Sequence, residues 1–177
     1  GFYCSFNNGL NISAEQLVQI RERMKVLIDA DIPITKRSYP KEEAIALFEK
    51  LGMKDKVKLF YYRRSSSVNI YCLGDYYDYF YGYMMPSTGY VNLFDVIPYE
   101  NGLMLILPVE GKPDELPVFK PRKHLFDTLM ESTNWNLQFG IDTVGDLNEA
   151  ICSGRVQDLI LVQEALQERR IGEIAKE

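Results

Sequence analysis

The hydrophobic pattern of this 177-residue chain changes its period twice along the sequence. Apolar residues recur at helical spacing in residues 13–51, and β-branched and aromatic residues dominate residues 57–109. Helical spacing then returns from residue 124 to the end. This order predicts an α+β fold with helices packed on one face of an antiparallel sheet, followed by a mostly helical C-terminal extension. We expect an α+β domain over residues 1–107 and a linker with helical connector over 108–177.

The first half carries clear start and stop signals. Ser13 followed by Gln16 forms a capping box, which predicts that a helix begins there. A short strand is expected around residues 34–37, followed by a helix over 41–51. Gly52 stands where a left-handed residue ends that helix.

Strands are predicted for KVKLFYY (residues 56–62) and SVNIYCLG (residues 67–74), which are rich in β-branched and aromatic residues. Glu100-Asn101-Gly102 separates two further apolar runs, residues 90–99 and 103–109. Asn-Gly between apolar runs is the strongest short hairpin signal, so these runs should pair.

The C-terminal part begins with EGKPDELPVFKPRK (residues 110–123), whose prolines and charges indicate a linker or extended arm. Helices are expected over residues 124–131, from Thr143 with Asp146 as its acidic capping partner, and from about Arg155. No stop signal follows the last apolar stripe. We therefore expect the protein to continue beyond this sequence.

Composition limits the function. A net charge of −5 argues against nucleic acid as an obligatory partner. Arg63-Arg64 and the run from Lys120 to His124 are interpreted as solvated loops, with phosphate or RNA contact as the alternative. His124 is the only histidine, which excludes a His-rich zinc site within the chain and favours a surface or capping role. No apolar run is long enough to span a membrane, so no membrane partner is expected.

The three cysteines are widely spaced and odd in number, which is typical of reduced thiols in a cytoplasmic protein. No glycine-rich phosphate loop is present in the chain.

The stretch GDYYDYFYGYMMPSTG, from Gly74 to Gly89, has six aromatic residues among the eight from Tyr76 to Tyr83. If it is a strand, alternate tyrosines share one face, and packing against a helix or partner is the favoured interpretation. Stacking on a base or another ligand is the alternative.

Three stretches resemble the second additional domain of threonyl- and alanyl-tRNA synthetases: GFYCSF (residues 1–6), residues 12–52, and Gly74–Gly89. The resemblance extends over roughly residues 1–99. The last motif is the most specific, because the positions shared with the family fall in register: Gly74, Asp75, Asp78, Gly82, Pro86, Ser87, Thr88 and Gly89.

The resemblance implies that the ancestral chemistry is lost. The family domain edits mischarged tRNA with an H-x-x-x-H pair and with the Cys and His of its last motif, in some members around zinc. Here Phe80 and Met84 stand at the Cys and His positions, Tyr81 and Tyr83 replace the Arg and Pro between them, and the H-x-x-x-H pair would lie before Gly1. Phenyl and thioether groups cannot act as bases. We therefore expect no catalytic residue, metal or cofactor in this chain, and a degenerate pocket formed by Asp75, Asp78, Phe80, Tyr81, Tyr83, Met84, Ser87 and Thr88.

The C-terminal stretch, residues 143–177, resembles the region before the P-loop domain of long bacterial nucleoside kinases of the uridine kinase or phosphoribulokinase-like type. That resemblance implies a kinase domain beyond Glu177, which would bind ATP and Mg²⁺. The chain would then be a non-catalytic accessory domain whose partner is its own kinase domain, with homo-oligomerisation as an option. Two alternatives remain open: an aminoacyl-tRNA-binding or editing-like module with altered chemistry, which binds a tRNA end, and a nucleoside-sensing pocket.

Overall fold

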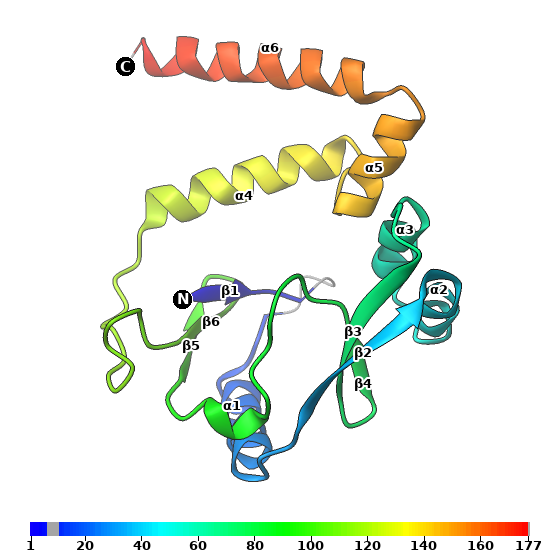
Figure 1. The fold of residues 1–177 in the computed structure, drawn as a ribbon. Coiled ribbons are helices and arrows are strands. Elements are labelled where there is room, and N and C mark those ends of the chain that lie inside the picture. Colours follow the sequence, from blue (N-terminus) through cyan, green and yellow to red (C-terminus); the bar gives the residue numbers. More distant parts are fainter. Residues whose placement is uncertain (7–10, 177) are drawn as a thin grey trace. The chain divides into compact units, whose positions relative to one another are not determined.

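The computed structural model describes residues 1–6 and 11–176. The chain forms two compact units, each built from two separate stretches (Figure 1). Unit 1 comprises residues 1–37 and 70–121, and unit 2 comprises 38–69 and 122–177. The fold is α+β, as predicted from the change in hydrophobic period. None of the described helices is long and apolar enough to cross a membrane.

Unit 1 begins with a three-stranded antiparallel sheet and one long helix. Strands β1 (Phe2–Cys4), β6 (Gly102–Ile106) and β5 (Asp95–Tyr99) pair in the order β1-β6-β5. Tyr99 pairs directly with Gly102, which leaves a two-residue turn at Glu100-Asn101 and confirms the predicted hairpin. Glu100 adopts the left-handed conformation there, with φ +49°.

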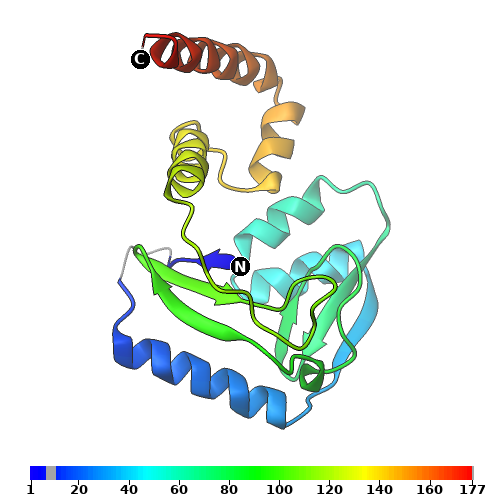
Figure 2. The same ribbon diagram turned by 90° about the vertical axis from the view of Figure 1, so that its left-hand side faces the viewer.

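Helix α1 (Ala14–Asp29) covers one face of this sheet (Figure 2). Its predicted capping box is confirmed, because the Ser13 hydroxyl accepts from the Gln16 amide at 3.1 Å and the Gln16 side chain accepts from the Ser13 amide at 2.9 Å. Leu17 packs with Val96 and Leu103 in the core. Partly buried side chains surround this core: Ile12, Ile20, Met24, Phe94 and Leu105.

A second sheet has the strand order β2-β3-β4 and contains the start of the aromatic stretch. β2 spans Ile34–Pro40, which confirms the predicted strand and extends it by three residues. β3 (Ser67–Leu73) follows the prediction, and it pairs antiparallel with β4 (Tyr76–Asp78).

Unit 2 begins with a helical hairpin, where one prediction is wrong. α2 (Lys41–Lys50) is the expected helix, and Gly52 ends it with φ +73°. Residues 56–62 were predicted as a strand, but 56–61 belong to α3 (Lys54–Tyr61) and Tyr62 is its C-cap. The Phe60 ring packs against Phe48 of α2 with 5.4 Å between ring centroids, and both side chains are fully buried. This tertiary contact outweighs the strand-like composition of the segment.

The C-terminal helices are α4 (Lys123–Gln138), α5 (Val144–Cys152) and α6 (Val156–Ile174). α4 begins where expected and runs seven residues beyond the predicted end. The capping partners of α5 are confirmed: Thr143 Oγ1 accepts from the Asp146 amide at 3.2 Å, and Asp146 Oδ2 accepts from the Thr143 amide at 2.8 Å. Residues 107–122, before α4, contain neither helix nor strand.

α5 is held against α3 by charge and by a close approach. Lys58 Nζ donates to Asp146 Oδ1 at 2.7 Å and to Glu149 Oε2 at 2.8 Å. A Cβ atom on Gly145 would lie 3.0 Å from the Leu59 amide nitrogen, so a larger residue would require the two helices to shift slightly. The Asp146 pKa is lowered to about 2, chiefly because of the hydrogen bond from Lys58.

Candidate functional site: an exposed aromatic loop

The aromatic stretch is mostly loop. Leu73 pairs with Tyr76, so Gly74 and Asp75 form a two-residue turn in which Gly74 has φ +59° and Asp75 is exposed. β4 ends at Asp78, and residues 79–86, here called the aromatic loop, have no regular structure. Beyond Asp78 the strand alternation considered from sequence therefore does not apply, and the tyrosines do not share one strand face.

Asp78, the last residue of β4, accepts two hydrogen bonds from neighbouring tyrosines. Its Oδ1 accepts from the Tyr79 amide at 2.7 Å, and its Oδ2 accepts from the Tyr76 hydroxyl at 3.4 Å. The side chain is half-buried. These bonds give Asp78 a structural role in turning the chain from strand to loop.

Tyr71, on β3, holds the aromatic loop in place. Its hydroxyl donates to the Gly82 carbonyl at 2.7 Å and accepts from the Met84 amide at 3.3 Å. Its ring meets Phe80 edge-on, with 6.4 Å between centroids. Tyr71 is buried, whereas Phe80 and Met84 are 43% and 39% exposed. One buried phenol thus anchors both sides of Gly82, which itself has φ +107°.

Tyr81 and Tyr83 project from this anchored loop into solvent. Their exposed fractions are 96% and 97%, so the rest of the chain covers very little of either side chain. The Lys36 ammonium lies 5.0 Å from the Tyr83 ring centroid and 5.7 Å from that of Tyr71. Both distances are within the range of cation–π attraction. The aromatic loop therefore exposes two phenol rings, and one of them, Tyr83, lies beside a lysine.

Thr88 clamps the C-terminal side of the loop to the end of α1. Its amide donates to the Ile32 carbonyl at 3.0 Å, and its hydroxyl accepts from the Ile32 amide at 2.8 Å. The same hydroxyl donates to the Leu27 carbonyl at 2.5 Å. Thr88 is buried at the start of the short 3₁₀ turn Thr88–Tyr90, so its polar atoms serve the fold.

Ser87 and Gly89 complete this clamp around Asp31, which has φ +45°. The Ser87 hydroxyl donates to Asp31 Oδ1, and the Gly89 amide donates to the same oxygen at 3.1 Å. A Cβ atom on Gly89 would collide with the Asp31 carboxylate, so glycine is required there. The Pro86 carbonyl accepts from the Ile34 amide at 2.8 Å.

The chemistry of this site is suited to binding. Its side chains are phenols, a phenyl ring, thioethers and the Lys36 ammonium, none of which is an imidazole or thiol. His124 is an exposed residue at the start of α4, in unit 2. In residues 1–6 and 11–176, no three His, Cys, Asp or Glu side chains gather as a metal site would require. Stacking and cation–π contact are what the loop offers.

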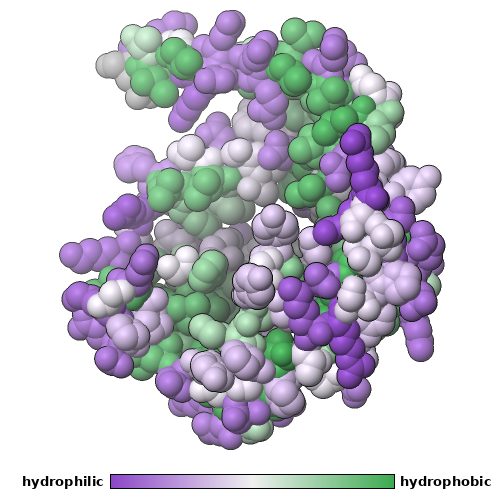
Figure 3. All heavy atoms as spheres, in the orientation of Figure 1, coloured by the Kyte–Doolittle hydropathy of each residue, from purple (hydrophilic) through white to green (hydrophobic). Residues whose placement is uncertain are grey.

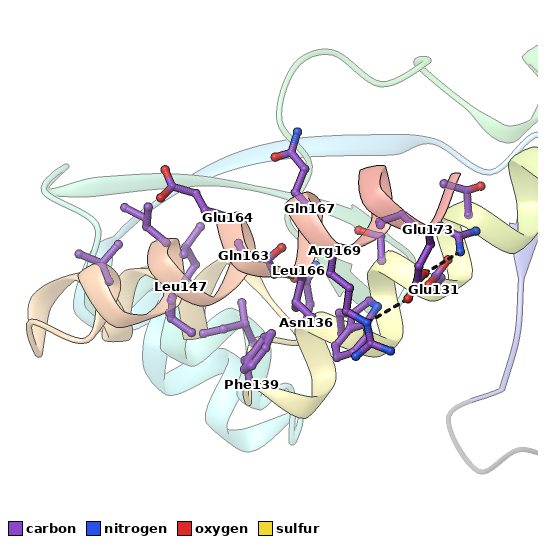
Figure 4. A pocket seen from close by; sticks show the side chains of 18 residues that line it. Glu131, Asn136, Phe139, Leu147, Gln163, Glu164, Leu166, Gln167, Arg169 and Glu173 are labelled. Carbon is purple, nitrogen blue, oxygen red and sulfur yellow. Dashed lines mark hydrogen bonds and ion pairs between the residues drawn. The ribbon is translucent and has the colours of Figure 1, made fainter. Parts of the chain in front are cut away.

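A separate groove lies in unit 2 between α4 and α6 (Figure 4). Its volume is about 720 Å³, with Trp135 and Phe139 on one side and Leu159 and Leu166 on the other. Figure 3 shows apolar and charged side chains interspersed over α6, whose described residues include none that is buried. The lining residues described for this groove include neither histidine nor cysteine, so it offers apolar surface without an evident catalytic group.

Fold and site together define an α+β module whose motif residues maintain a clamp and whose exposed residues are aromatic. No protein-family model matches the chain. It is 35% identical over 95 residues to the threonine–tRNA ligase of Hahella chejuensis, 37% over 90 residues to that of Rhodospirillum rubrum, and 36% over 96 residues to that of Aquifex aeolicus. These matches cover 50–53% of this chain and 14–15% of the relatives.

About half of the chain is therefore similar to a part of threonine–tRNA ligases, and it spans about 15% of their length. This supports the predicted resemblance to the synthetase module. The expected nucleoside-kinase context gains no support from these relatives.

Proposed function

We propose that this chain is an RNA-binding module related to threonine–tRNA ligases, which holds the single-stranded 3′ end of a tRNA on the aromatic loop without hydrolysing it. The observation that carries this proposal is the near-complete exposure of Tyr81 and Tyr83 on a loop that Tyr71 and Thr88 fix at both sides. Because both side chains are almost fully exposed to solvent, they make little contribution to packing within the chain.

The arrangement suits an unpaired nucleotide. Bases stack on aromatic rings whatever their sequence, with about 1–3 kcal/mol per stacked base. Lys36 beside Tyr83 adds a positive charge for a phosphate, and it lies in the same unit as the loop. The tRNA partner is favoured by the relatives, whose name states that they join threonine to tRNA.

Binding without hydrolysis follows from the residues at the reactive positions of the resemblance. Phe80 and Met84 can neither accept a proton nor activate water. Asp78 is a carboxylate near the loop, and its two oxygens bond to Tyr79 and Tyr76. It therefore serves the strand end, and we expect no editing reaction at this loop.

The test compares two labelled RNA hairpins, one with a single-stranded 3′ extension and one blunt, by fluorescence anisotropy. The intact chain should bind the extended hairpin more tightly. Tyr81→Ala with Tyr83→Ala should weaken that preference by roughly 5- to 150-fold for each base that stacks. Tyr90→Ala is the matched control, because Tyr90 is 60% exposed and lies outside the loop.

Equal affinity for the two hairpins, or an equal loss with Tyr90→Ala, would contradict the proposed function. Release of amino acid from an aminoacyl-tRNA is the second measurement. A rate above background that depends on Asp78 would show that the loop catalyses hydrolysis, and it would overturn binding without chemistry.

A further inference from the structure

The segment from Lys50 to Arg64 in unit 2, here called the basic hairpin segment, has a charge opposite to that of the chain. It contains six lysines and arginines and one aspartate, a net charge of +5. The whole chain carries −5, so all other residues together carry −10. Such a concentration of positive charge in an acidic protein marks a surface for a polyanion.

Two groups of cations lie at opposite ends of α3. Lys50 and Lys54 flank the turn at Gly52, and Arg63 and Arg64 follow the last turn of the helix. The eight residues of α3 separate the two groups by about 12 Å. Such spacing suits a stiff, elongated anion whose charges recur along its length, rather than a single small ligand.

The backbone around both groups is held in place. The Lys41 amide donates to the Ser66 carbonyl at 3.0 Å, and Lys41 Nζ reaches the Arg63 carbonyl at 3.5 Å. The loop after α3 is thereby tied to the start of α2. At the other end, the Gly52 amide donates to the Glu49 carbonyl at 3.0 Å. The cations are thus presented on a defined scaffold.

Some cations of this segment form ion pairs with carboxylates of the chain, and others do not. Lys58 is neutralised by Asp146 and Glu149, and Lys56 lies 3.3 Å from Asp55. Lys50, Lys54 and Arg64 are exposed, and the described part of the chain offers them no ion pair. These three side chains are therefore open to an external anion.

The exposed Tyr61 lies between the two groups. Its ring is 69% exposed and meets Tyr62 edge-on at 5.1 Å, on a groove of about 660 Å³. Glu49 and Glu149 also line that groove. Their negative charge disfavours phosphate inside it, so the favourable positions for phosphates are at the two cationic ends.

We propose that the basic hairpin segment binds the phosphate backbone of double-stranded RNA, through Lys50, Lys54 and Arg64. This inference rests on the proposed function for the choice of RNA as the polyanion, and it concerns a surface in a different unit from the aromatic loop. Contacts to phosphate carry no sequence information, so the segment strengthens and orients binding while the aromatic loop selects an unpaired end.

The test uses the whole 177-residue chain and a blunt RNA hairpin, which lacks the single-stranded end that the aromatic loop requires. The variant combines Lys50→Gln, Lys54→Gln and Arg64→Gln. The matched control removes the same charge elsewhere, from two lysines and one arginine: Lys120→Gln, Lys176→Gln and Arg23→Gln. Both sets replace exposed side chains, for which changes in stability are usually small.

Affinity for the hairpin is measured by anisotropy over a range of salt concentrations. Each phosphate contact contributes roughly 0.9 to the slope of log affinity against log salt for a duplex. The triple variant should therefore lower the magnitude of the slope by about 2 to 3, whereas the control should leave it unchanged.

An equal change in both variants would overturn the proposal, because only net charge would then matter. So would a wild-type chain that does not bind the blunt hairpin, or one that binds polyglutamate as tightly as RNA. The proposed function fails in a different way, through loss of the preference for a single-stranded 3′ end. The two outcomes are thus distinguishable with the same protein.

Discussion

Tyr71→Phe removes one oxygen atom from beneath the aromatic loop and leaves the ring in place. The phenol donates to the Gly82 carbonyl at 2.7 Å and accepts from the Met84 amide at 3.3 Å. A phenylalanine keeps the edge contact with Phe80 and the ring face near Lys36. The substitution therefore tests the anchoring of the loop separately from the packing beneath it.

The expected magnitude follows from the two lost hydrogen bonds. Each neutral hydrogen bond contributes about 0.5–1.5 kcal/mol net, so the loop should lose about 1–3 kcal/mol of ordering. If Tyr81 and Tyr83 must be held in place to stack on RNA, the same free energy is lost from binding. Affinity for the hairpin with a single-stranded 3′ end should then fall by roughly 5- to 150-fold.

Two measurements check this reasoning. Hydrogen exchange should show faster exchange at the Met84 amide, which loses its acceptor, and anisotropy should show the weaker binding. Tyr90→Phe serves as the control, because Tyr90 lies outside the loop and is largely exposed. If Met84 keeps its protection in Tyr71→Phe, the phenol does not anchor the loop. If protection falls but affinity does not, the loop need not be ordered to bind.

Substitutions at three further positions test the scaffold. Thr88→Val keeps the shape of the side chain but leaves the Ile32 amide and the Leu27 carbonyl without their hydrogen bonds to the hydroxyl. The free energy of unfolding, measured in urea, should fall by on the order of 2–4 kcal/mol. An unchanged midpoint of urea unfolding would refute the clamp. Lys58→Met should return the Asp146 pKa from about 2 toward 3.8 in an NMR titration. A carboxyl group whose pKa is lower in the folded state stabilises the fold at every pH above its pKa in the unfolded chain. The wild type should therefore lose this stability as the pH falls from about 4 to about 2, and the variant should not. Gly52 has φ +73° and open space around it, so Gly52→Ala should lower the free energy of unfolding by about 1 kcal/mol through backbone strain alone. Gly52→Asn should lower it by less, because asparagine adopts the left-handed conformation more readily.

Local signals in the sequence were sufficient where the deciding contacts are themselves local. The capping box at Ser13, the left-handed residue at Gly52 and the turn at Glu100-Asn101 each depend on neighbours within a few positions. Residues 56–62 show the limit of such signals. Their β-branched and aromatic residues are typical of a strand, but the Phe48–Phe60 contact favours a helix.

The candidate site could be predicted only in part for the same reason. The aromatic residues are visible in the sequence, and so are Phe80 and Met84, which stand where the resemblance implies reactive residues. Lys36 and Tyr71 carry no motif, because β2 and β3 bring them to the loop from distant positions. Of the basic hairpin segment, only Arg63-Arg64 forms a cluster that the sequence shows directly, because the other cations are spread over the end of α2 and along α3.

The clamp gives the Pro-Ser-Thr-Gly motif a structural role that does not depend on any chemistry at the aromatic loop. Thr88 and Gly89 hold the end of α1 through hydrogen bonds and through a close approach that a larger residue would prevent. Replacement of Thr88 or Gly89 would lower the stability of the fold, whatever the loop binds. Phe80 and Met84 are partly exposed, and Phe80 contributes an edge contact with Tyr71, so their side chains contribute less to the scaffold than the clamp does. Pro-Ser-Thr-Gly therefore serves the fold, and the proposed function rests on the exposed rings of Tyr81 and Tyr83.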